Sequence, residues 1–313
     1  MILVTGGAGF LGSHIVRRLI QEGESVRVLV RDPDRADREG RLAGLPVESI
    51  QGDVTRPESL KPAVHATQAV IHTAAIAIER GDSTYERVND QGTVHLVEAC
   101  KQAGVRRFLN VSQLGADPDL PYRFLASKGR AQAHVAQSGL DWTAFRPSVI
   151  WGPEDEFANT FARLIPLTPF IFPCIGGEKA RFQPVWVEDV VSTVVACLRD
   201  PATIGEEFEL GGPEVLTLGE MERRILKATG ARRLLIPFPM PLLRVAVHLM
   251  EALLPNPPVT SSLLELLGVS NVSIANALPR FVSQPRPFAP EYLAEYMRGF
   301  KVSDTLRQYL GRA

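Results

Sequence analysis

The chain has 313 residues, 45% of them hydrophobic, which is enough for one large domain or two modest ones with a substantial core. Its 34 lysines and arginines nearly balance its 35 aspartates and glutamates, so neither a nucleic-acid-binding surface nor an acidic tail is indicated. The three cysteines are widely separated and favour buried thiols in a reducing compartment. No apolar run is as long as a membrane span, and no signal peptide is expected before the first predicted strand. We therefore expect a cytoplasmic protein.

The first dozen residues predict a strand, a glycine-rich turn and a helix in direct succession. Residues 2–4 are apolar and favour a buried strand, and residues 13–22 place their apolar side chains on one helix face. Gly6 suits the tight turn, Gly9 permits the backbone to approach a pyrophosphate, and Gly12 permits close packing of the helix on the strand. Phosphates would bind at the helix N-terminus. An ordinary glycine loop is the alternative, which the strand and helix on either side disfavour.

Strands and helices alternate along the next 150 residues. Further strands are predicted over residues 26–30, 47–51, 69–72, 107–111 and 142–150. Helices are predicted over residues 58–66, 85–103, 122–137 and 188–198, the first of them opened by a capping box of Thr55 and Glu58. This order indicates right-handed βαβ units, and hence an α/β fold with a doubly wound parallel sheet.

The alternation breaks after Trp151, where a stretch rich in proline and phenylalanine begins. We expect a dinucleotide-binding domain of residues 1–153 plus about 180–205. A smaller, mostly helical and discontinuous domain, for a substrate or a partner, would contain about 154–179 plus 206–313. In this second part Thr217 and Glu220 predict another capping box.

Several short motifs together resemble one protein superfamily. Residues 5–12, Thr5-Gly-Gly-Ala-Gly-Phe-Leu-Gly12, match the TGxxGxxG opening of the extended or atypical short-chain dehydrogenases/reductases. Later landmarks follow in the same order: Gly52-Asp53-Val54, His72-Thr-Ala-Ala75, Val88-Asn89, Arg146–Gly152 and Val187–Val191. Residues 253–260 and 263–272 are similar to a subgroup, the NAD(P)-binding proteins related to the 39 kDa accessory subunit of respiratory complex I. The resemblance implies a Rossmann fold and a dinucleotide cofactor.

The resemblance also implies which residues contact the cofactor. Asp53 resembles the acid that accepts a hydrogen bond from the adenine amine, and Val54 the residue that packs on the ring. An acid that caps the turn before the next helix is the alternative for Asp53. The expected cofactor-binding set is Gly6, Gly9, Phe10, Leu11, Gly12, Arg31, Arg35, Asp53, Val54, Thr73, Ala74, Ala75, Lys128, Pro147 and Val149.

Charge at the end of the second strand indicates which dinucleotide binds. NAD-binding relatives carry an acid there, which hydrogen-bonds the ribose 2′-hydroxyl. Here Arg31 takes that place and Arg35 follows. A guanidinium matches a 2′-phosphate in a bidentate manner. We therefore expect NADP(H), with NAD(H) disfavoured; the alternative is that Arg31 is a solvated charge and Asp32 serves the ribose.

The catalytic residues of the superfamily are incomplete in this chain. The resemblance assigns the lysine to Lys128, which in relatives holds the nicotinamide ribose and lowers the pKa of a tyrosine. That tyrosine position, four residues earlier, is Phe124, which cannot exchange a proton. The serine position falls at Gln113, beside Ser112. Tyr122 lies two residues too early to substitute, because two residues turn a helical side chain by roughly 200°.

Two hypotheses follow from these residues. The first is an NADP(H)-binding protein without dehydrogenase turnover, acting as a structural or regulatory component. The second is an active NADPH-dependent reductase or epimerase-type oxidoreductase, with another proton donor, on an apolar carbonyl, quinone or isoprenoid-like substrate. Phenylalanines such as Phe157 and Phe170 make the expected pocket apolar. No metal site is expected, because no histidine has a second ligand at suitable spacing.

The stretch from Pro239 to Leu254 predicts an amphipathic helix. Its apolar stripe, Leu242, Val245, Ala246, Leu249 and Leu253, is most simply explained by packing inside the second domain. The alternative is peripheral docking on a membrane or in a protein complex. The oligomeric state cannot be inferred from the sequence.

Overall fold

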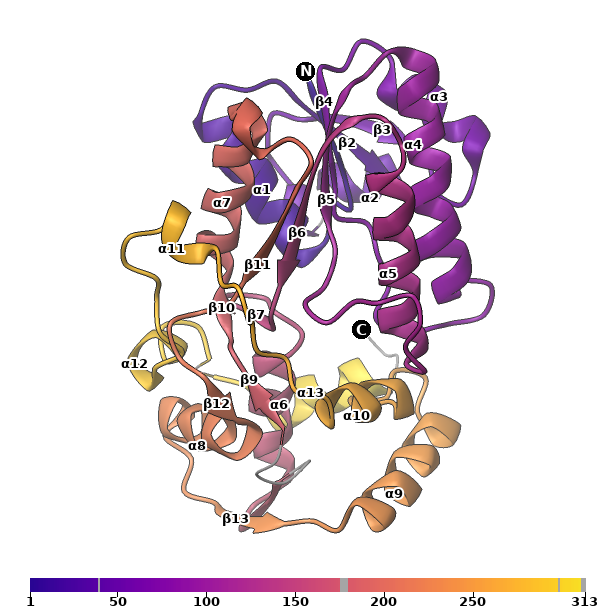
Figure 1. The fold of residues 1–313 in the computed structure, drawn as a ribbon. Helices are drawn as coiled ribbons and strands as arrows, with labels where there is room; N and C mark the ends of the chain where they lie inside the picture. Colours follow the sequence, from indigo (N-terminus) through magenta and orange to yellow (C-terminus); the bar gives the residue numbers. More distant parts are fainter. Residues whose placement is uncertain (39, 175–179, 298, 311–313) are drawn as a thin grey trace. The chain divides into compact units, whose positions relative to one another are not determined.

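The computed structural model describes residues 1–38, 40–174, 180–297 and 299–310. The chain forms two compact units (Figure 1). The first contains Met1–Pro147, Val187–Leu210 and Ala275–Gln284, and the second contains Ser148–Trp186, Gly211–Ile274 and Pro285–Ala313. Both units are therefore assembled from segments that are distant in sequence.

The first unit is built on a seven-stranded parallel sheet with the order β11-β6-β5-β4-β1-β2-β3. Its strands are β1 (Ile2–Thr5), β2 (Val26–Val30), β3 (Glu48–Gln51), β4 (Ala69–His72), β5 (Arg107–Val111), β6 (Asp141–Pro147) and β11 (Glu206–Leu210). The strand order reverses between β1 and β4, so the carboxyl ends of these two strands mark the topological switch point where such sheets bind ligands. The expected α/β doubly wound fold is confirmed.

Helices cover both faces of this sheet (Figure 1). One face carries α1 (Phe10–Gln21) and α7 (Val187–Arg199), and the other carries α3 (Leu60–Val64), α4 (Gly92–Ala103) and α5 (Arg123–Ala136). Leu3 of β1, Val70 of β4 and Leu96 of α4 belong to one buried cluster between the sheet and the second helix layer. Because the central strands β1, β2 and β4 are covered on both faces, their burial is continuous rather than alternating. The short α2 (Pro33–Arg38) and α11 (Leu278–Phe281) complete the α-helices described in this unit.

Two local details differ from the sequence-based expectations. The capping box of Thr55 and Glu58 is wrong: the Thr55 hydroxyl donates to Asp53 instead, and a 3-10 turn, Pro57–Ser59, precedes α3. The helix expected over residues 85–103 forms, but its first part, Glu86–Gln91, is a π-helical segment. Such segments are rare and are frequent at functional sites. The capping box of Thr217 and Glu220 is confirmed at the start of α8.

The second unit combines short strand pairs with helices. The strand expected over residues 142–150 is divided, because β6 ends at Pro147 and β7 (Ile150–Trp151) pairs separately. The remaining elements are β8 (Ile171–Cys174), β9 (Arg181–Phe182), β10 (Val185–Trp186), β12 (Leu216–Thr217), β13 (Leu234–Pro237), α6 (Ala158–Leu164), α8 (Leu218–Thr229), α9 (Met240–Leu253), α10 (Ser261–Leu267), α12 (Pro290–Leu293) and α13 (Val302–Tyr309). Within the described residues, no helix combines the length and apolar character needed to cross a membrane.

Candidate functional site

The glycine turn after β1 forms a tight backbone cradle at the switch point. Gly6 has a φ of 73°, and a Cβ on it would lie 2.7 Å from the backbone nitrogen of Ala74. The amide of Gly9 donates to the carbonyl of Gly6 at 2.8 Å, and α1 begins at Phe10. The first amides of a helix have no carbonyl partner within it, and the helix dipole is positive there. The cradle therefore has the donor set and the charge that a pyrophosphate requires.

The loop after β4 closes the other side of this turn. Thr73 donates from both its amide and its hydroxyl to the carbonyl of Thr5, at 3.1 and 2.8 Å. Ala74 contacts the position where a larger residue at Gly6 would intrude. The structure thus brings Thr73, Ala74 and the glycine turn together, as the sequence predicted for one site; their contact with a cofactor stays a prediction.

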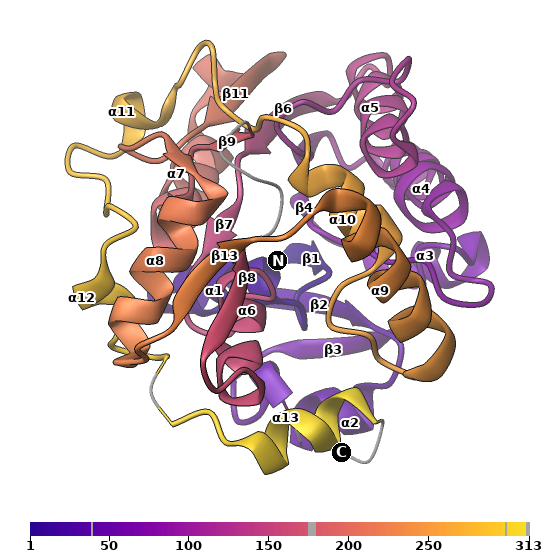
Figure 2. The ribbon, with the colours of Figure 1, turned by 90° about the horizontal axis from the view of Figure 1, so that it is seen from below.

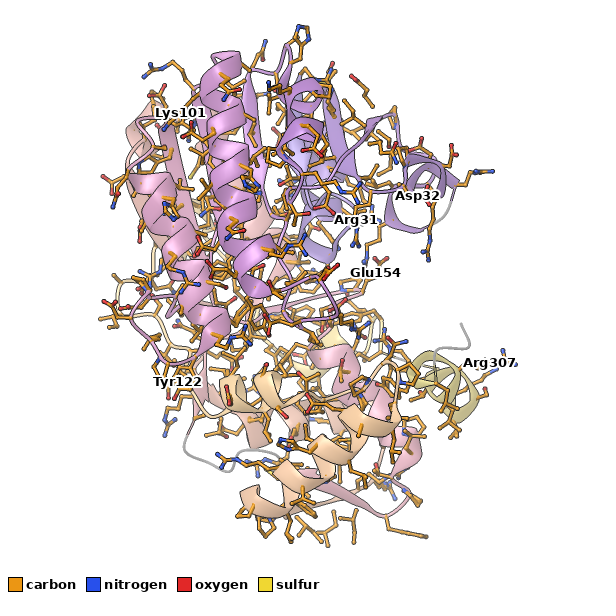
Figure 3. All side chains as sticks on the ribbon, turned by 90° about the vertical axis from the view of Figure 1, so that its right-hand side faces the viewer. Arg31, Asp32, Lys101, Tyr122, Glu154 and Arg307 are labelled. Carbon is orange, nitrogen blue, oxygen red and sulfur yellow. The ribbon has the colours of Figure 1, made fainter. Side chains whose placement is uncertain are left out.

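The residues that follow β2 present charge at the same edge of the sheet (Figure 3). Arg31 and Asp32 lie next to each other there, and both are exposed. The Oδ1 atom of Asp32 accepts a hydrogen bond at 3.0 Å from the amide of Arg35, so this carboxylate caps α2. Asp32 was the alternative ligand for the ribose, and one of its two carboxylate oxygens is thus already used to cap α2.

Asp53 and Val54 follow β3. One oxygen of Asp53, Oδ1, accepts from both the amide and the hydroxyl of Thr55 at 2.8 Å, which is the turn-capping alternative. Val54 is buried, and it contacts the position of Gly92 at the start of α4. Their expected contacts with adenine stay a prediction, and the second oxygen of Asp53 is the atom left for that role.

A buried polar network links the ends of β1 and β4 to the π-helical segment. The two nitrogens of His72 lie 2.7 Å from the Thr5 hydroxyl and 3.0 Å from the Thr93 hydroxyl. Because the Thr93 hydroxyl donates its hydrogen to the Asn89 carbonyl at 2.6 Å, it must accept one from His72. The proton of His72 is therefore on Nε2, and Nδ1 accepts from Thr5. Burial and the nearby Lys128 charge lower the pKa of His72 to about 3, so the ring is neutral.

Asn89 extends the network to α5. Its side-chain amide pairs with both backbone groups of Ile76, at 2.8 and 3.1 Å, and donates to Ser127 at 3.2 Å. The Ser127 hydroxyl in turn donates to the carbonyl of Phe124. This network is not predicted by the sequence pattern. The landmarks at His72 and Asn89 were the available signal, but their partners lie far away in the sequence.

Lys128 is the buried cation of the site. Its Nζ atom donates to the carbonyl of Val111 at 2.7 Å, and burial lowers its pKa to about 8. Among the ion pairs of the described residues, none includes Lys128. An ammonium has three N–H groups, so Val111 leaves further donors. These donors fit the hydroxyls of a ribose.

Phe124 occupies the turn of α5 before Lys128, and its ring packs edge-on against Tyr85 at 5.7 Å. The hydroxyl of Tyr85 donates to the carbonyl of Ala77. Tyr122 is the N-cap of α5 rather than part of the helix (Figure 3). Ser112 is buried, and Gln113 is half-buried. The structure thus keeps Lys128 in α5, but the superfamily's tyrosine position one turn earlier has no hydroxyl, because it is Phe124.

The remaining predicted positions are less informative. Pro147 is the buried last residue of β6 in the first unit. Val149 belongs to the second unit, where its carbonyl accepts from Val185 at 2.9 Å. Most of the aromatic residues expected to line a pocket are buried in the second unit, but Phe170 is 79% exposed. Within the described residues, no group of three or more histidine, cysteine, aspartate or glutamate side chains can hold a metal ion.

Comparison with known proteins gives a consistent result. Residues 6–201 match a family model described as NAD(P)H-binding. The chain is 32% identical over 222 residues to the mitochondrial NADH dehydrogenase (ubiquinone) 1 alpha subcomplex subunit 9 of Arabidopsis thaliana, covering 70% of this chain and 55% of that protein. The chain therefore spans about half the length of this relative.

A second relative and a solved structure add to this comparison. A protein of Caulobacter vibrioides named ceramide reductase is 31% identical over 253 residues, covering 80% of this chain and 78% of that protein. The crystal structure of the Thermus thermophilus UDP-glucose 4-epimerase with NAD has a TM-score of 0.71 at 23% identity, covering 95% of this chain and 97% of that one. The second similarity supports the fold alone.

Proposed function

We propose that this chain, which belongs to the NAD(P)H-binding short-chain dehydrogenases/reductases related to the complex I 39 kDa subunit, binds NADP(H) in its first unit without the family's tyrosine-dependent turnover. In this proposal it is a cofactor-binding structural or regulatory component. Binding of a dinucleotide follows from the family, whereas the preference for NADP(H) and the absence of turnover are our inferences.

Each part of the cofactor has residues of suitable chemistry. The N-terminal amides of α1, at Phe10, Leu11 and Gly12, would hold the pyrophosphate. Arg31 and Arg35 would hold the 2′-phosphate, which a guanidinium binds in a bidentate manner. Asp53 and Val54 would contact the adenine, and Thr73, Ala74 and Ala75 the middle of the dinucleotide. Pro147 completes the proposed set in the first unit. Bound NADPH supplies a hydride equivalent.

One observation carries the functional part of the proposal. Lys128 keeps its buried position, its carbonyl partner Val111 and spare donors, whereas Phe124 provides no proton at the position one turn earlier. Ribose binding requires only the ammonium, but the usual proton transfer requires a hydroxyl as well. The site therefore supports cofactor binding more strongly than turnover.

The second candidate function is an NADPH-dependent reductase acting on an apolar carbonyl, quinone or isoprenoid-like substrate. The similarity to a protein named ceramide reductase favours it. A proton donor other than residue 124 would then be needed, and a bound water is the candidate. We also propose that residues 1–153 plus about 180–205 serve the dinucleotide, and that 154–179 plus 206–313 serve the substrate or partner.

The proposed location is the cytoplasm, with peripheral association at a membrane or in a protein complex. The Arabidopsis relative is named as a subunit of a mitochondrial complex, which supports assembly with other proteins. Nucleic acid is not among the proposed partners, because the net charge of the chain is −1.

The experiment is a fluorescence titration with NADPH, followed by absorbance at 340 nm with NADPH and a panel of carbonyls, including a long-chain lipid ketone and a soluble quinone. We expect saturable binding and no oxidation of NADPH above the rate without protein. Absence of binding would overturn the whole proposal. Substrate-dependent oxidation would overturn the non-catalytic role in favour of the reductase.

A further inference from the structure

The second unit exposes apolar side chains that three neighbouring elements contribute. We call this surface the apolar face and define it by Phe170, Ile171, Leu234, Ile236, Phe238, Leu242, Val245, Leu249 and Leu253. Strands β8 and β13 pair in parallel, and the amide of Phe238 donates to the carbonyl of Cys174, so these segments are joined by hydrogen bonds. Soluble proteins rarely expose so many large apolar residues on one surface without a partner.

Helix α9 is apolar on two sides. Leu243 and Val247 are buried, at 6% and 0% exposure, and α9 contacts α10 of the same unit. Leu242, Val245 and Leu249 follow the i, i+3, i+7 spacing of a single face, and their side chains are 59–68% exposed. The prediction that this stripe packs inside the second domain is therefore wrong. The side of α9 that carries Leu243 and Val247 packs inside the second unit. The side that carries Leu242, Val245 and Leu249 is exposed and can contact a partner surface.

Charges beside the apolar face have mainly one sign. Residues 231–254 contain three arginines and one acid. Arg232 and Arg244 are exposed, whereas Arg233 donates to the carbonyl of Thr168. The one acid, Glu251, accepts hydrogen bonds from the amide and hydroxyl of Ser261, at 2.8 and 2.6 Å. With three arginines against one acid, this segment has a formal charge of 3 − 1 = +2.

We propose that the apolar face docks on the surface of a lipid bilayer with anionic headgroups. Acyl chains would receive the aliphatic and aromatic side chains, while headgroup phosphates would receive Arg232 and Arg244. The helix has 14 residues and is about 21 Å long, shorter than the ~30 Å hydrocarbon core, so it would lie in the interface.

Strand β13 and helix α9 lie on the same side of the second unit (Figure 1, Figure 2). In Figure 1, β13 and α9 both lie along the lower edge of the second unit, and in Figure 2, seen from below, both face the viewer. A protein partner would need a matching surface that is apolar at its centre and acidic at its edge. An anionic bilayer supplies both chemistries along its whole surface. This inference does not depend on the cofactor site.

The test is flotation of the full chain with vesicles of phosphatidylcholine alone or with 30% phosphatidylglycerol, at low and high salt. We expect co-flotation with the anionic vesicles, reduced by salt. The double variant Val245→Asp/Leu249→Asp should bind at least about 10-fold more weakly, because acids replace buried apolar contacts. Arg232→Glu/Arg244→Glu should remove the preference for anionic vesicles.

The matched control is Ile274→Asp, which places an acid at a 98% exposed position of the same unit outside the apolar face. It should float like the original protein, and NADPH titration of each variant reports whether the first unit is intact. Flotation of Val245→Asp/Leu249→Asp at the original level would overturn the proposal. Failure of the original protein to float with anionic vesicles would also overturn it. The same holds if light scattering shows that the apolar face joins two copies of the chain instead.

Discussion

The Nζ atom of Lys128 lies 2.7 Å from the carbonyl oxygen of Val111, at the carboxyl end of β5. This contact ties a buried cation in α5 to the edge of the sheet where the glycine turn and the His72 network also lie. The cation persists here beside a phenylalanine at the family's tyrosine position. We propose that the remaining donors of Lys128 bind a dinucleotide.

The pH dependence of stability should report the burial of Lys128. Its pKa is about 8 in the folded chain against 10.5 for an ordinary lysine, so the unfolded chain binds more protons between these values. Stability should therefore rise with pH from about 8 to 10.5, by roughly 3 kcal/mol from this group. Chemical denaturation along this range should show the rise in the original protein and its loss in Lys128→Met. A parallel rise in both proteins would contradict the assignment.

His72 should act on stability in the acidic range. Its folded pKa of about 3 lies below the ordinary 6.5, so the unfolded chain binds an extra proton between these values and stability falls as pH falls through this window. The buried carboxyl of Asp155, whose pKa is raised to about 6, acts in the opposite direction. The difference between the original protein and His72→Gln isolates the histidine. Equal slopes between pH 6.5 and 4 in the two proteins would refute a neutral buried imidazole.

The glycine turn can be tested with a matched pair of substitutions. Gly6→Ala and Gly23→Ala both place an alanine at positive φ, 73° and 82°, but only Gly6 faces crowding, by Thr73 and Ala74. The backbone strain should cost about 1–2 kcal/mol in each, and Gly6→Ala should lose more and should also lose NADPH binding. Thermal unfolding and fluorescence titration measure the two effects. If Gly6→Ala and Gly23→Ala lost similar amounts of stability and of NADPH affinity, the turn would not be a binding cradle.

Phe124→Tyr tests whether the site is a remnant of a complete catalytic one. The introduced hydroxyl would stand one turn before Lys128, where its pKa would be lowered by the ammonium. If the rest of the site is intact, NADPH oxidation with a carbonyl substrate should appear in the variant and be absent in Phe124→Leu. An inert Phe124→Tyr that still binds NADPH would show that residues other than 124 also prevent turnover.

The sequence predicted the elements that depend on local patterns. The strands β1, β2 and β4, the helix over Arg123–Ala136 and the capping box of Thr217 all follow from periodicity or short-range hydrogen bonds. The helix at 58–66 was predicted with the wrong cap, because Asp53 competes for the hydroxyl of Thr55. Local patterns do not determine which of two nearby partners a side chain selects.

Features that depend on tertiary neighbours were not predictable from the sequence. The tautomer of His72 depends on Thr93 and on the carbonyl of Asn89, which a later segment of the chain contributes. The exposure of α9 was also missed, because two apolar faces of one helix give no sign of which is buried. The burial of Leu243 and Val247 in the folded chain shows which face of α9 packs inward.

The most direct measurement is the ratio of NADPH to NADH affinity in the original protein, in Arg31→Asp and in Arg38→Asp. Arg38 is an exposed arginine of α2 whose guanidinium donates to the carbonyl of Asp34, so it is the matched control. We predict tighter binding of NADPH than of NADH, lost or reversed in Arg31→Asp and kept in Arg38→Asp, because only Arg31 stands at the end of β2. Equal affinities in the original protein, or an unchanged ratio in Arg31→Asp, would contradict the account.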